Sequence, residues 1–216
     1  MNYRLELGHL IAKNGGGTFK NLTDVLYYTR LFKYVYKKQY RMINNLFYKV
    51  TADWKLLELC ERGYLFSPQK DVYCATTKVD PLLKEAGYLT VFPDQPKGIG
   101  DINQFNNTEV FIKLLKEPHF YTLLFPNFGY LVPDALLVEK KVEVIEDEEI
   151  KKYKLTFIEV EAPKPDWTNY LRGKEKNYLQ LAKDYQFYEV WSNYCEQLNL
   201  PKPTLDIKFN YKIYKL

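Results

Sequence analysis

Cysteine and histidine are scarce in this 216-residue chain, and their scarcity argues against several classes of site. The three cysteines, Cys60, Cys74 and Cys195, are odd in number and far apart, so neither a disulfide framework nor a zinc knuckle is supported. We expect them to be reduced thiols in the core. Because the chain has only two histidines, His9 and His119, a histidine-rich metal cage and a Cys–His hydrolase are also unsupported.

Long apolar runs are absent as well. No segment approaches the roughly 18 uncharged apolar residues that a membrane-spanning helix needs. The N-terminal Met-Asn-Tyr-Arg-Leu-Glu carries charges where the apolar stretch of a signal peptide would begin. Hydrophobic residues nonetheless make up 46% of the chain and charged residues 27%, a composition that excludes disorder. We therefore expect a globular, soluble, cytoplasmic protein with no membrane partner.

Positive charge is concentrated in the first part of the chain. Residues 1–87 hold 14 Lys or Arg against 8 Asp or Glu, whereas residues 88–216 hold 17 against 19. This division predicts that polyanion binding belongs to the first part and that the second part uses its carboxylates for another purpose. Ordinary scatter of charge is the alternative, and charge alone does not decide between the two.

The first part has the element order of a winged helix. Apolar residues recur at helical spacing in two stretches, Thr51 can cap a third helix, and Gly63 can end it. A turn at residues 68–71 then separates two short segments of strand-like composition. The expected elements are helices over residues 21–34, 37–47 and 51–63 and strands over residues 64–67 and 72–77. Three helices followed by a hairpin predict a winged helix.

A winged helix places its third helix in the major groove of duplex DNA and its hairpin along the phosphates. Arg30 and Lys33 could add phosphate contacts, but Glu58 and Glu61 make the third helix less basic than that of a strong DNA binder. The same fold also serves for dimerisation or scaffolding. No residue can be assigned to a base edge, so no sequence specificity is predicted. The predicted DNA contacts are Lys37, Lys38, Arg41, Lys49, Lys55, Arg62 and Lys70.

Proline and glycine cluster between residues 91 and 100, as in a linker. We place the domain boundary near residue 90, which gives a winged-helix DNA-binding domain over residues 1–90 and a second domain over residues 91–216. The second domain is expected to contain, in chain order, a helix (104–116), three strands (120–125, 130–138 and 153–161), two helices (167–183 and 187–198) and a strand (205–214).

Two glutamates share one face of the third strand of this domain. Because side chains alternate along a strand, Glu159 and Glu161 lie on the same face as Leu155 and Phe157, where an uncompensated charge is unfavourable. If the preceding strand pairs with it as a hairpin, Asp134 lies about 5 Å away, one strand spacing. Three carboxylates on neighbouring strands suit Mg²⁺ or Mn²⁺. The alternative is a solvated strand end at which Asp134 caps a turn.

The motifs of the whole chain resemble those of a known family. Their order is Val72-Tyr-Cys-Ala-Thr in the hairpin, Pro133-Asp134, Glu159-Val-Glu161, and Lys174 with Tyr178 one helical turn later. This order resembles the PD-(D/E)XK nuclease superfamily and, more narrowly, the replication-relaxation family, over roughly residues 20–185. The resemblance implies an α+β chain with an N-terminal winged helix followed by an α/β PD-(D/E)XK nuclease-like domain with a central mixed sheet. It places metal-binding acids at Asp134 and Glu159.

One signature position departs from the superfamily, because its lysine is replaced by Glu161. The resemblance implies Lys174 as the substitute, with Lys176 second. It also implies Glu109, on the helix before the first strand, as an additional metal ligand; a surface acid beside Lys113 is an equal alternative. The predicted metal ligands are thus Asp134, Glu159, Glu161 and Glu109, and the predicted catalytic residues are Asp134, Glu159, Glu161 and Lys174.

Three functions fit these features. The first is a Mg²⁺- or Mn²⁺-dependent DNA endonuclease or nickase in plasmid or phage replication or mobilisation, in which Lys174 offsets charge that develops at the phosphate. The second is a catalytically inactive nuclease-fold accessory, and the third is a winged-helix transcriptional regulator. The expected partners are double-stranded DNA and replication or mobilisation proteins, and a homodimer would suit cleavage of both strands.

Aromatic residues make up 17% of the chain. Their helical spacing around Tyr27, Phe32 and Tyr36 indicates packing in a core more than stacking on bases. For the stretch from Trp191 to Leu198, packing and a dimer face both stay open.

Overall fold

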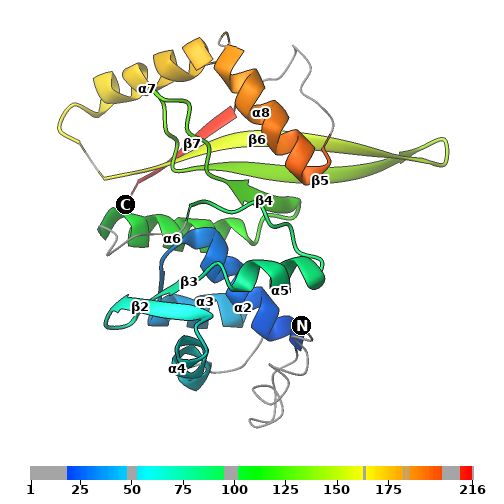
Figure 1. The fold of residues 1–216 in the computed structure, drawn as a ribbon. Helices are drawn as coiled ribbons and strands as arrows, with labels where there is room; N and C mark the ends of the chain where they lie inside the picture. The colour runs from blue at the N-terminus through cyan, green and yellow to red at the C-terminus, as the bar shows by residue number, and fades with distance from the viewer. Residues whose placement is uncertain are drawn as a thin grey trace. The chain divides into compact units, whose positions relative to one another are not determined.

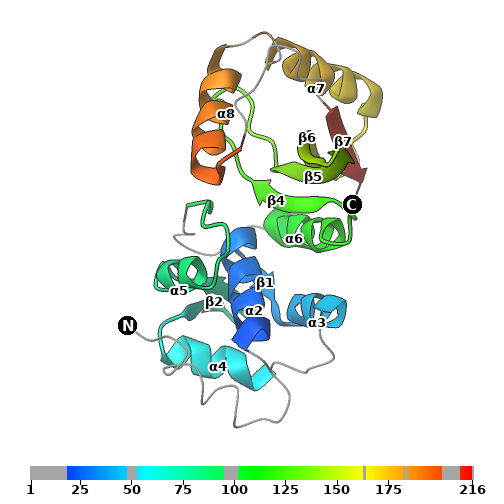
Figure 2. The same ribbon diagram turned by 90° about the vertical axis from the view of Figure 1, so that its right-hand side faces the viewer.

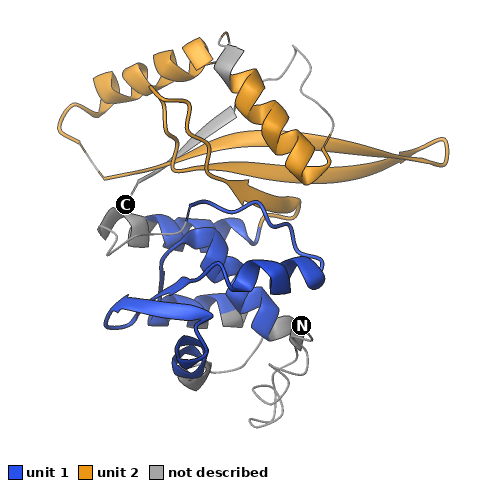
Figure 3. Cartoon of the chain, in the orientation of Figure 1, with its two compact units in different colours: residues 1–116 blue, residues 117–216 orange. Residues whose placement is uncertain are grey.

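The structure is a computed structural model that describes residues 19–47, 53–94, 102–162, 164–181, 183, 185–200 and 210–215. The chain forms two compact units, residues 1–116 and residues 117–216 (Figure 3). The predicted α+β class is confirmed. The division falls after the helix over residues 102–114, which we expected in the second domain because of the linker signature near residue 90. Among the described helices, none combines the length and apolar composition needed to cross a membrane.

The first unit combines helices with a small antiparallel sheet (Figure 1). Its elements are α2 (Phe19–Phe32), β1 (Val35–Tyr36), α3 (Lys37–Phe47), α4 (Asp53–Glu61), β2 (Leu65–Gln69), β3 (Val72–Ala75), α5 (Val79–Glu85) and α6 (Ile102–Leu114). The strand order is β1-β3-β2, with both pairings antiparallel. The predicted helices and hairpin are therefore present. The sequence did not predict β1, and the predicted cap Thr51 lies outside the described residues.

Local backbone geometry explains where α4 ends and where the β2–β3 hairpin turns. Gly63 has a φ of 71°, which glycine adopts without a Cβ penalty, and its N–H donates to the Cys60 carbonyl at 2.9 Å. The Tyr64 N–H donates to the Leu59 carbonyl at 2.9 Å, which closes the last turn of the helix. At the hairpin tip Asp71 has a φ of 62°. The predicted helix stop at Gly63 is thus confirmed.

Buried side chains hold the first unit together. Tyr34, Val72 and Cys74 form one cluster, against which Tyr36 and Phe66 pack. On α2, Tyr27 and Phe32 are buried as well, as their spacing predicts. Burial raises the pKa of the Cys74 thiol to about 12. All three cysteines are free, which agrees with the expected reduced thiols.

The second unit is built around a mixed four-stranded sheet. Its elements are β4 (Phe120–Leu124), β5 (Ala135–Ile145), β6 (Glu148–Glu161), α7 (Trp167–Leu181), α8 (Tyr185–Leu198) and β7 (Asn210–Lys215). The strand order is β4-β5-β6-β7, in which the first three strands are antiparallel neighbours and β7 is parallel to β6. Both α7 and α8 lie on the same face of this sheet (Figures 1 and 2).

Aromatic contacts fix α7 and α8 to that face. The ring of Phe157 on β6 lies 5.0 Å from that of Tyr178 on α7 and 6.2 Å from that of Phe187 on α8. Phe128 also packs on Phe157, at 6.1 Å between ring centroids. Trp191 is buried, as expected for a packing residue of α8. These contacts place the α7 side chains over the end of β6 where the two glutamates lie.

The β5–β6 hairpin is longer than the sequence predicts. Among the described strands, β4 pairs with β5 as far as Glu139, and β7 pairs with β6 from Thr156 onwards. Between these points residues 141–152 form a two-stranded extension, here called the arm. It turns at Glu146 and Asp147, whose φ angles are 52° and 65°, and it matches the solvated hairpin tip expected from the acidic run.

Candidate functional site

The end of β6 brings Glu159 against α7. Only 2% of Glu159 is exposed, and both of its carboxylate oxygens accept hydrogen bonds. The Tyr178 hydroxyl donates to Oε1 at 2.5 Å, and the Lys174 ammonium lies 2.9 Å from Oε2. A buried carboxylate needs such partners, because a charge in an apolar environment is strongly unfavourable alone. Lys174 and Tyr178, which the sequence places on one face of a helix, thus both contact Glu159.

Lys174 also joins Glu159 to Glu161. Its ammonium lies 3.2 Å from Glu161 Oε1. Glu161 accepts a further hydrogen bond from the Tyr170 hydroxyl, and Lys164 lies 3.3 Å from its Oε2. Sequence reasoning missed Tyr170, although Tyr170, Lys174 and Tyr178 recur every four residues and so share one face of α7.

Asp134 lies beside this cluster, immediately before β5. The antiparallel pairing of β5 with β6, which the sequence analysis assumed, is confirmed, and it places Ala135 opposite Ile158. The Val160 N–H donates to Asp134 Oδ2 at 2.6 Å. Asp134 directly precedes Ala135 and Glu159 directly follows Ile158, so the pairing and the Val160 contact place Asp134 beside Glu159. Asp134 thus does not merely cap a turn.

The pKa values of the cluster shift in different directions. Burial raises the pKa of Glu159, and the hydrogen bonds from Tyr178 and Lys174 offset only part of that rise. For Glu161, burial also acts to raise the pKa, but the hydrogen bonds from Tyr170, Lys174 and Lys164 outweigh it and the pKa falls below its usual value. Burial lowers the pKa of Lys174, yet the two glutamates outweigh it and raise the pKa. Lys174 therefore stays charged at neutral pH.

The acidic side chains of the cluster differ in how well they suit a divalent cation. Within the described ranges no three acidic, histidine or cysteine side chains form a group suited to holding an ion. Mg²⁺, however, commonly binds through one or two carboxylates and keeps several waters. Asp134 and Glu159 are neighbouring oxygen donors of that kind. The residues that fit a divalent ion are thus this pair, while Glu161 is held by Lys164, Lys174 and Tyr170.

Two other residues named from the sequence lie elsewhere. Glu109 is on α6 in the first unit, where its carboxylate is 2.9 Å from the Lys38 ammonium. Lys176, the second choice for the missing lysine, is exposed on α7. Of the two lysines, Lys174, the first choice for the missing signature lysine, is therefore the one that contacts Glu159.

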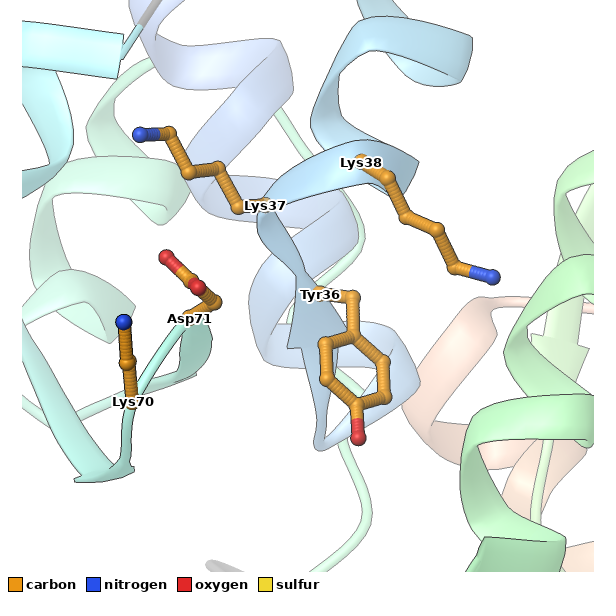
Figure 4. Close-up of a pocket in the computed structure, with 5 residues that line it drawn as sticks. All are labelled: Tyr36, Lys37, Lys38, Lys70 and Asp71. Atoms are coloured by element: carbon orange, nitrogen blue, oxygen red, sulfur yellow. The ribbon is translucent and has the colours of Figure 1, made fainter.

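Basic side chains of the first unit gather around the hairpin tip. Tyr36, Lys37, Lys38, Lys70 and Asp71 line an open hollow of about 570 Å³ (Figure 4). The Lys37 N–H donates to the Asp71 carbonyl at 2.8 Å, which joins the start of α3 to the tip. Lys37 and Lys70 extend near Asp71, whereas Lys38 extends away from them (Figure 4). Three predicted DNA contacts therefore share one surface.

The remaining predicted DNA contacts differ in their surroundings. Arg62 is half-buried at the end of α4 and lies 3.4 Å from Glu58. The side chains of Arg41 and Lys55 and the whole of Lys49 lie outside the described residues. Arg30 is corrected to a structural residue: it is buried, it lies 3.0 Å from Asp80, and it donates to the Pro93 carbonyl at 2.7 Å.

Comparison with known proteins adds no relative to this description. The chain matches no protein-family model, no curated protein and no solved structure.

Proposed function

We propose that this protein binds double-stranded DNA through its first unit and hydrolyses DNA phosphodiesters at the Asp134–Glu159–Lys174 cluster of its second unit. The reaction would depend on Mg²⁺ or Mn²⁺ and would nick or cut the duplex. The observation that carries the proposal is the neighbouring pair Asp134 and Glu159, with the Lys174 ammonium 2.9 Å from Glu159. Two carboxylates and a lysine are the functional groups of a PD-(D/E)XK nuclease site.

The first unit supports DNA binding by its topology and its charge. Its element order of helix, strand, two helices and a hairpin agrees with the order expected of a winged helix, and β1 would be the additional strand of the sheet. Lys37 and Lys70 lie at the tip of the hairpin, the part of such a fold that follows the phosphates. The net positive charge of residues 1–87 would favour approach to a polyanion.

The second unit supports the nuclease assignment by its strand order. Three antiparallel strands, helices and a fourth strand parallel to the third agree with the core expected for the PD-(D/E)XK superfamily. Asp134 lies just before the second of these strands, and Glu159 lies near the end of the third. These are the positions of the metal-binding acids in the resemblance to the replication-relaxation family.

The cluster assigns a role to each residue. A bound divalent ion would supply charge neutralisation at the phosphate and would lower the pKa of a water. Asp134 and Glu159 would hold the ion, and Tyr178 would orient Glu159 through its hydrogen bond. Lys174, kept charged by the two glutamates, would face the negative charge of the phosphate. Glu161 and Glu159 together position its ammonium.

The same proposal gives the biological setting that the resemblance implies. We place the activity in plasmid or phage replication or mobilisation, in the cytoplasm, together with replication or mobilisation proteins.

Plasmid nicking tests the proposed reaction. Supercoiled plasmid is incubated with Mg²⁺ or Mn²⁺ and the wild-type protein, Asp134→Asn or the matched control Asp147→Asn, which lies at the exposed hairpin turn. We expect the wild type and Asp147→Asn to nick the plasmid and Asp134→Asn to lose at least about 100-fold in rate, as for removal of a major electrostatic group. Equal rates for Asp134→Asn and the wild type, or no nicking by either, contradict the reaction.

A second candidate is a DNA-binding accessory with a silent nuclease fold. The hydrogen bonds that occupy both Glu159 oxygens favour it, because an ion would have to share that carboxylate with Lys174. Duplex binding by a wild type that does not nick would support this alternative. Binding of similar strength to all duplexes, falling steeply with salt, would argue against a transcriptional regulator.

DNA binding has its own test. Lys37→Glu/Lys70→Glu reverses two charges at the hairpin tip, and we expect it to weaken duplex affinity by at least about tenfold at low salt and to reduce the salt dependence. The matched control, Lys140→Glu/Lys141→Glu, changes the net charge equally on β5 of the second unit and should bind DNA as the wild type does.

A further inference from the structure

The arm exposes apolar side chains that the rest of the second unit does not cover. Val142, Val144, Ile145 and Ile150 are all exposed, and Val144 has 70% of its surface accessible. In the register of the hairpin, Val142 and Val144 lie on one face, and Ile145 and Ile150 lie on the other. Exposed apolar residues concentrated on one element commonly mark an interaction surface.

Within the described residues, the outer edge of β6 has no partner strand along the arm. β5 pairs with one edge of Glu148–Lys152, whereas β7 pairs with the other edge only from Thr156 onwards. Among the described strands, no strand pairs with that second edge between Glu148 and Lys152. An edge of this kind offers a row of backbone donors and acceptors to a further strand. Two strands alone are only marginally stable in water.

The sequence of this edge is complementary to itself. It reads Glu148-Glu-Ile-Lys-Lys152, so an antiparallel copy centred on Ile150 sets Glu148 opposite Lys152 and Glu149 opposite Lys151. Opposite charges directly across a strand pair are stabilising, and like charges are destabilising. We propose that a second copy of this chain pairs with this edge, β6 to β6 and antiparallel about Ile150, to form a four-stranded intermolecular sheet with two-fold symmetry.

The charges select this register over its neighbours. Centring the pair on Glu149 sets that glutamate opposite itself, and centring it on Lys151 sets two lysines opposite each other. A parallel in-register pair sets every charge opposite its own kind. On β5 the segment Lys141-Val-Glu143 gives fewer complementary pairs than Glu148–Lys152 gives on β6. The β6 edge is therefore the better match for a second copy.

The pairing also leaves room for the rest of the sheet. In the register centred on Ile150, Asp147 of the copy would lie opposite Tyr153. Its turn would thus end before Thr156, where β7 begins to pair with β6. The two arms would lie side by side with their sheets at opposite ends. This dimer does not depend on the proposed DNA cleavage, because none of its residues belongs to the acid–lysine cluster.

Charge reversal and mixing test the proposal with the full chain. Lys151→Glu/Lys152→Glu makes the edge wholly acidic, and Glu148→Lys/Glu149→Lys makes it wholly basic. By sedimentation equilibrium we expect the wild type to dimerise and each variant to raise the dimer dissociation constant by at least about tenfold. An equimolar mixture of the two variants restores opposite charges at every pair and should form a heterodimer. Restoration also requires both variants to be folded.

A control on β5 tests whether β6 is the strand that pairs with the second copy. Lys140→Glu/Lys141→Glu changes the net charge by the same amount on β5, and we expect it to dimerise as the wild type does. A wild type that stays monomeric to about 100 µM overturns the proposal. The proposal is also overturned if either β6 double variant dimerises like the wild type, or if the mixture of two folded variants fails to associate. It is overturned as well if the β5 control loses as much dimer affinity as the β6 variants do.

Discussion

The two halves of β6 accommodate charge in different ways. In the outer half, Glu148–Lys152, every residue is exposed and water solvates the acidic and basic side chains. In the inner half, Leu155–Val160, every residue is buried, and Glu159 is tolerated only with Tyr178 and Lys174 as partners. The same strand pairing runs through both halves. Burial therefore decides whether a glutamate on this strand needs hydrogen-bonding or charged partners.

The ion pairs of the two halves differ accordingly. Lys152 contacts Glu143 across the arm with 57% of its side chain exposed, whereas Lys174 contacts Glu159 with 19% and 2% of the two side chains exposed. Exposed pairs contribute little to stability because water and salt screen them. Breaking a buried pair leaves an uncompensated charge in the interior.

The largest expected effect is the loss of Phe157. Phe157→Ala removes a fully buried ring that contacts Tyr178 and Phe187, and we expect the free energy of unfolding to fall by about 3–5 kcal/mol. Val144→Ala, on the outer part of the hairpin, should leave it almost unchanged. Urea denaturation followed by circular dichroism compares the two. If Phe157→Ala lowers the free energy of unfolding no more than Val144→Ala does, the inner half of β6 is not part of a packed core.

The next effect comes from removing one partner of each ion pair. Lys174→Met keeps the length of the side chain but leaves Glu159 without its ammonium, and we expect a loss of about 2–3 kcal/mol. Lys152→Met breaks an exposed pair and should leave the unfolding free energy almost unchanged. If the two variants lose equal stability in the same denaturation experiment, Lys174 does not compensate a buried carboxylate.

The smallest expected effect is a difference between Glu159 and Glu161 in how their contributions to stability depend on pH. The pKa of Glu159 is raised in the folded state, so its contribution to stability is full below the unfolded pKa of about 4.3 and declines as the pH rises through the folded pKa. The stability of Glu159→Gln relative to the wild type should therefore increase with pH. The pKa of Glu161 is lowered, so its contribution declines as the pH falls through the folded pKa. Relative stability of Glu161→Gln should therefore decrease with rising pH.

Denaturation midpoints and slopes across a pH series from about 3 to 8 give both curves. Slopes of the same sign for Glu159→Gln and Glu161→Gln would show that the two carboxyl groups do not differ in the way their burial and partners imply.

Much of the inner half was readable from the sequence. The alternation after Leu155 predicted that Glu159 and Glu161 share a face of the strand, and the spacing of Lys174 and Tyr178 predicted that these two share a face of the helix. These patterns are local, so they need no knowledge of the fold. Tyr170 completes the same spacing and was available to the same reasoning.

Other features depend on distant parts of the chain. β1 has only two residues, too few for a periodic pattern, and it exists because it pairs with β3. The arm is rich in Lys and Glu, which are depleted in strands, so its strand structure comes from hairpin pairing. Arg30 resembled a surface base, but its partner Asp80 lies 50 residues further along the chain. Local sequence does not encode such contacts.

Cation binding tests most directly whether Asp134 and Glu159 act together. Mn²⁺ is titrated calorimetrically into the wild type, Asp134→Asn and the control Asp147→Asn. We predict saturable binding to the wild type and to Asp147→Asn, and its loss in Asp134→Asn. Absence of saturable binding to the wild type, or equal binding to Asp134→Asn, would contradict the account.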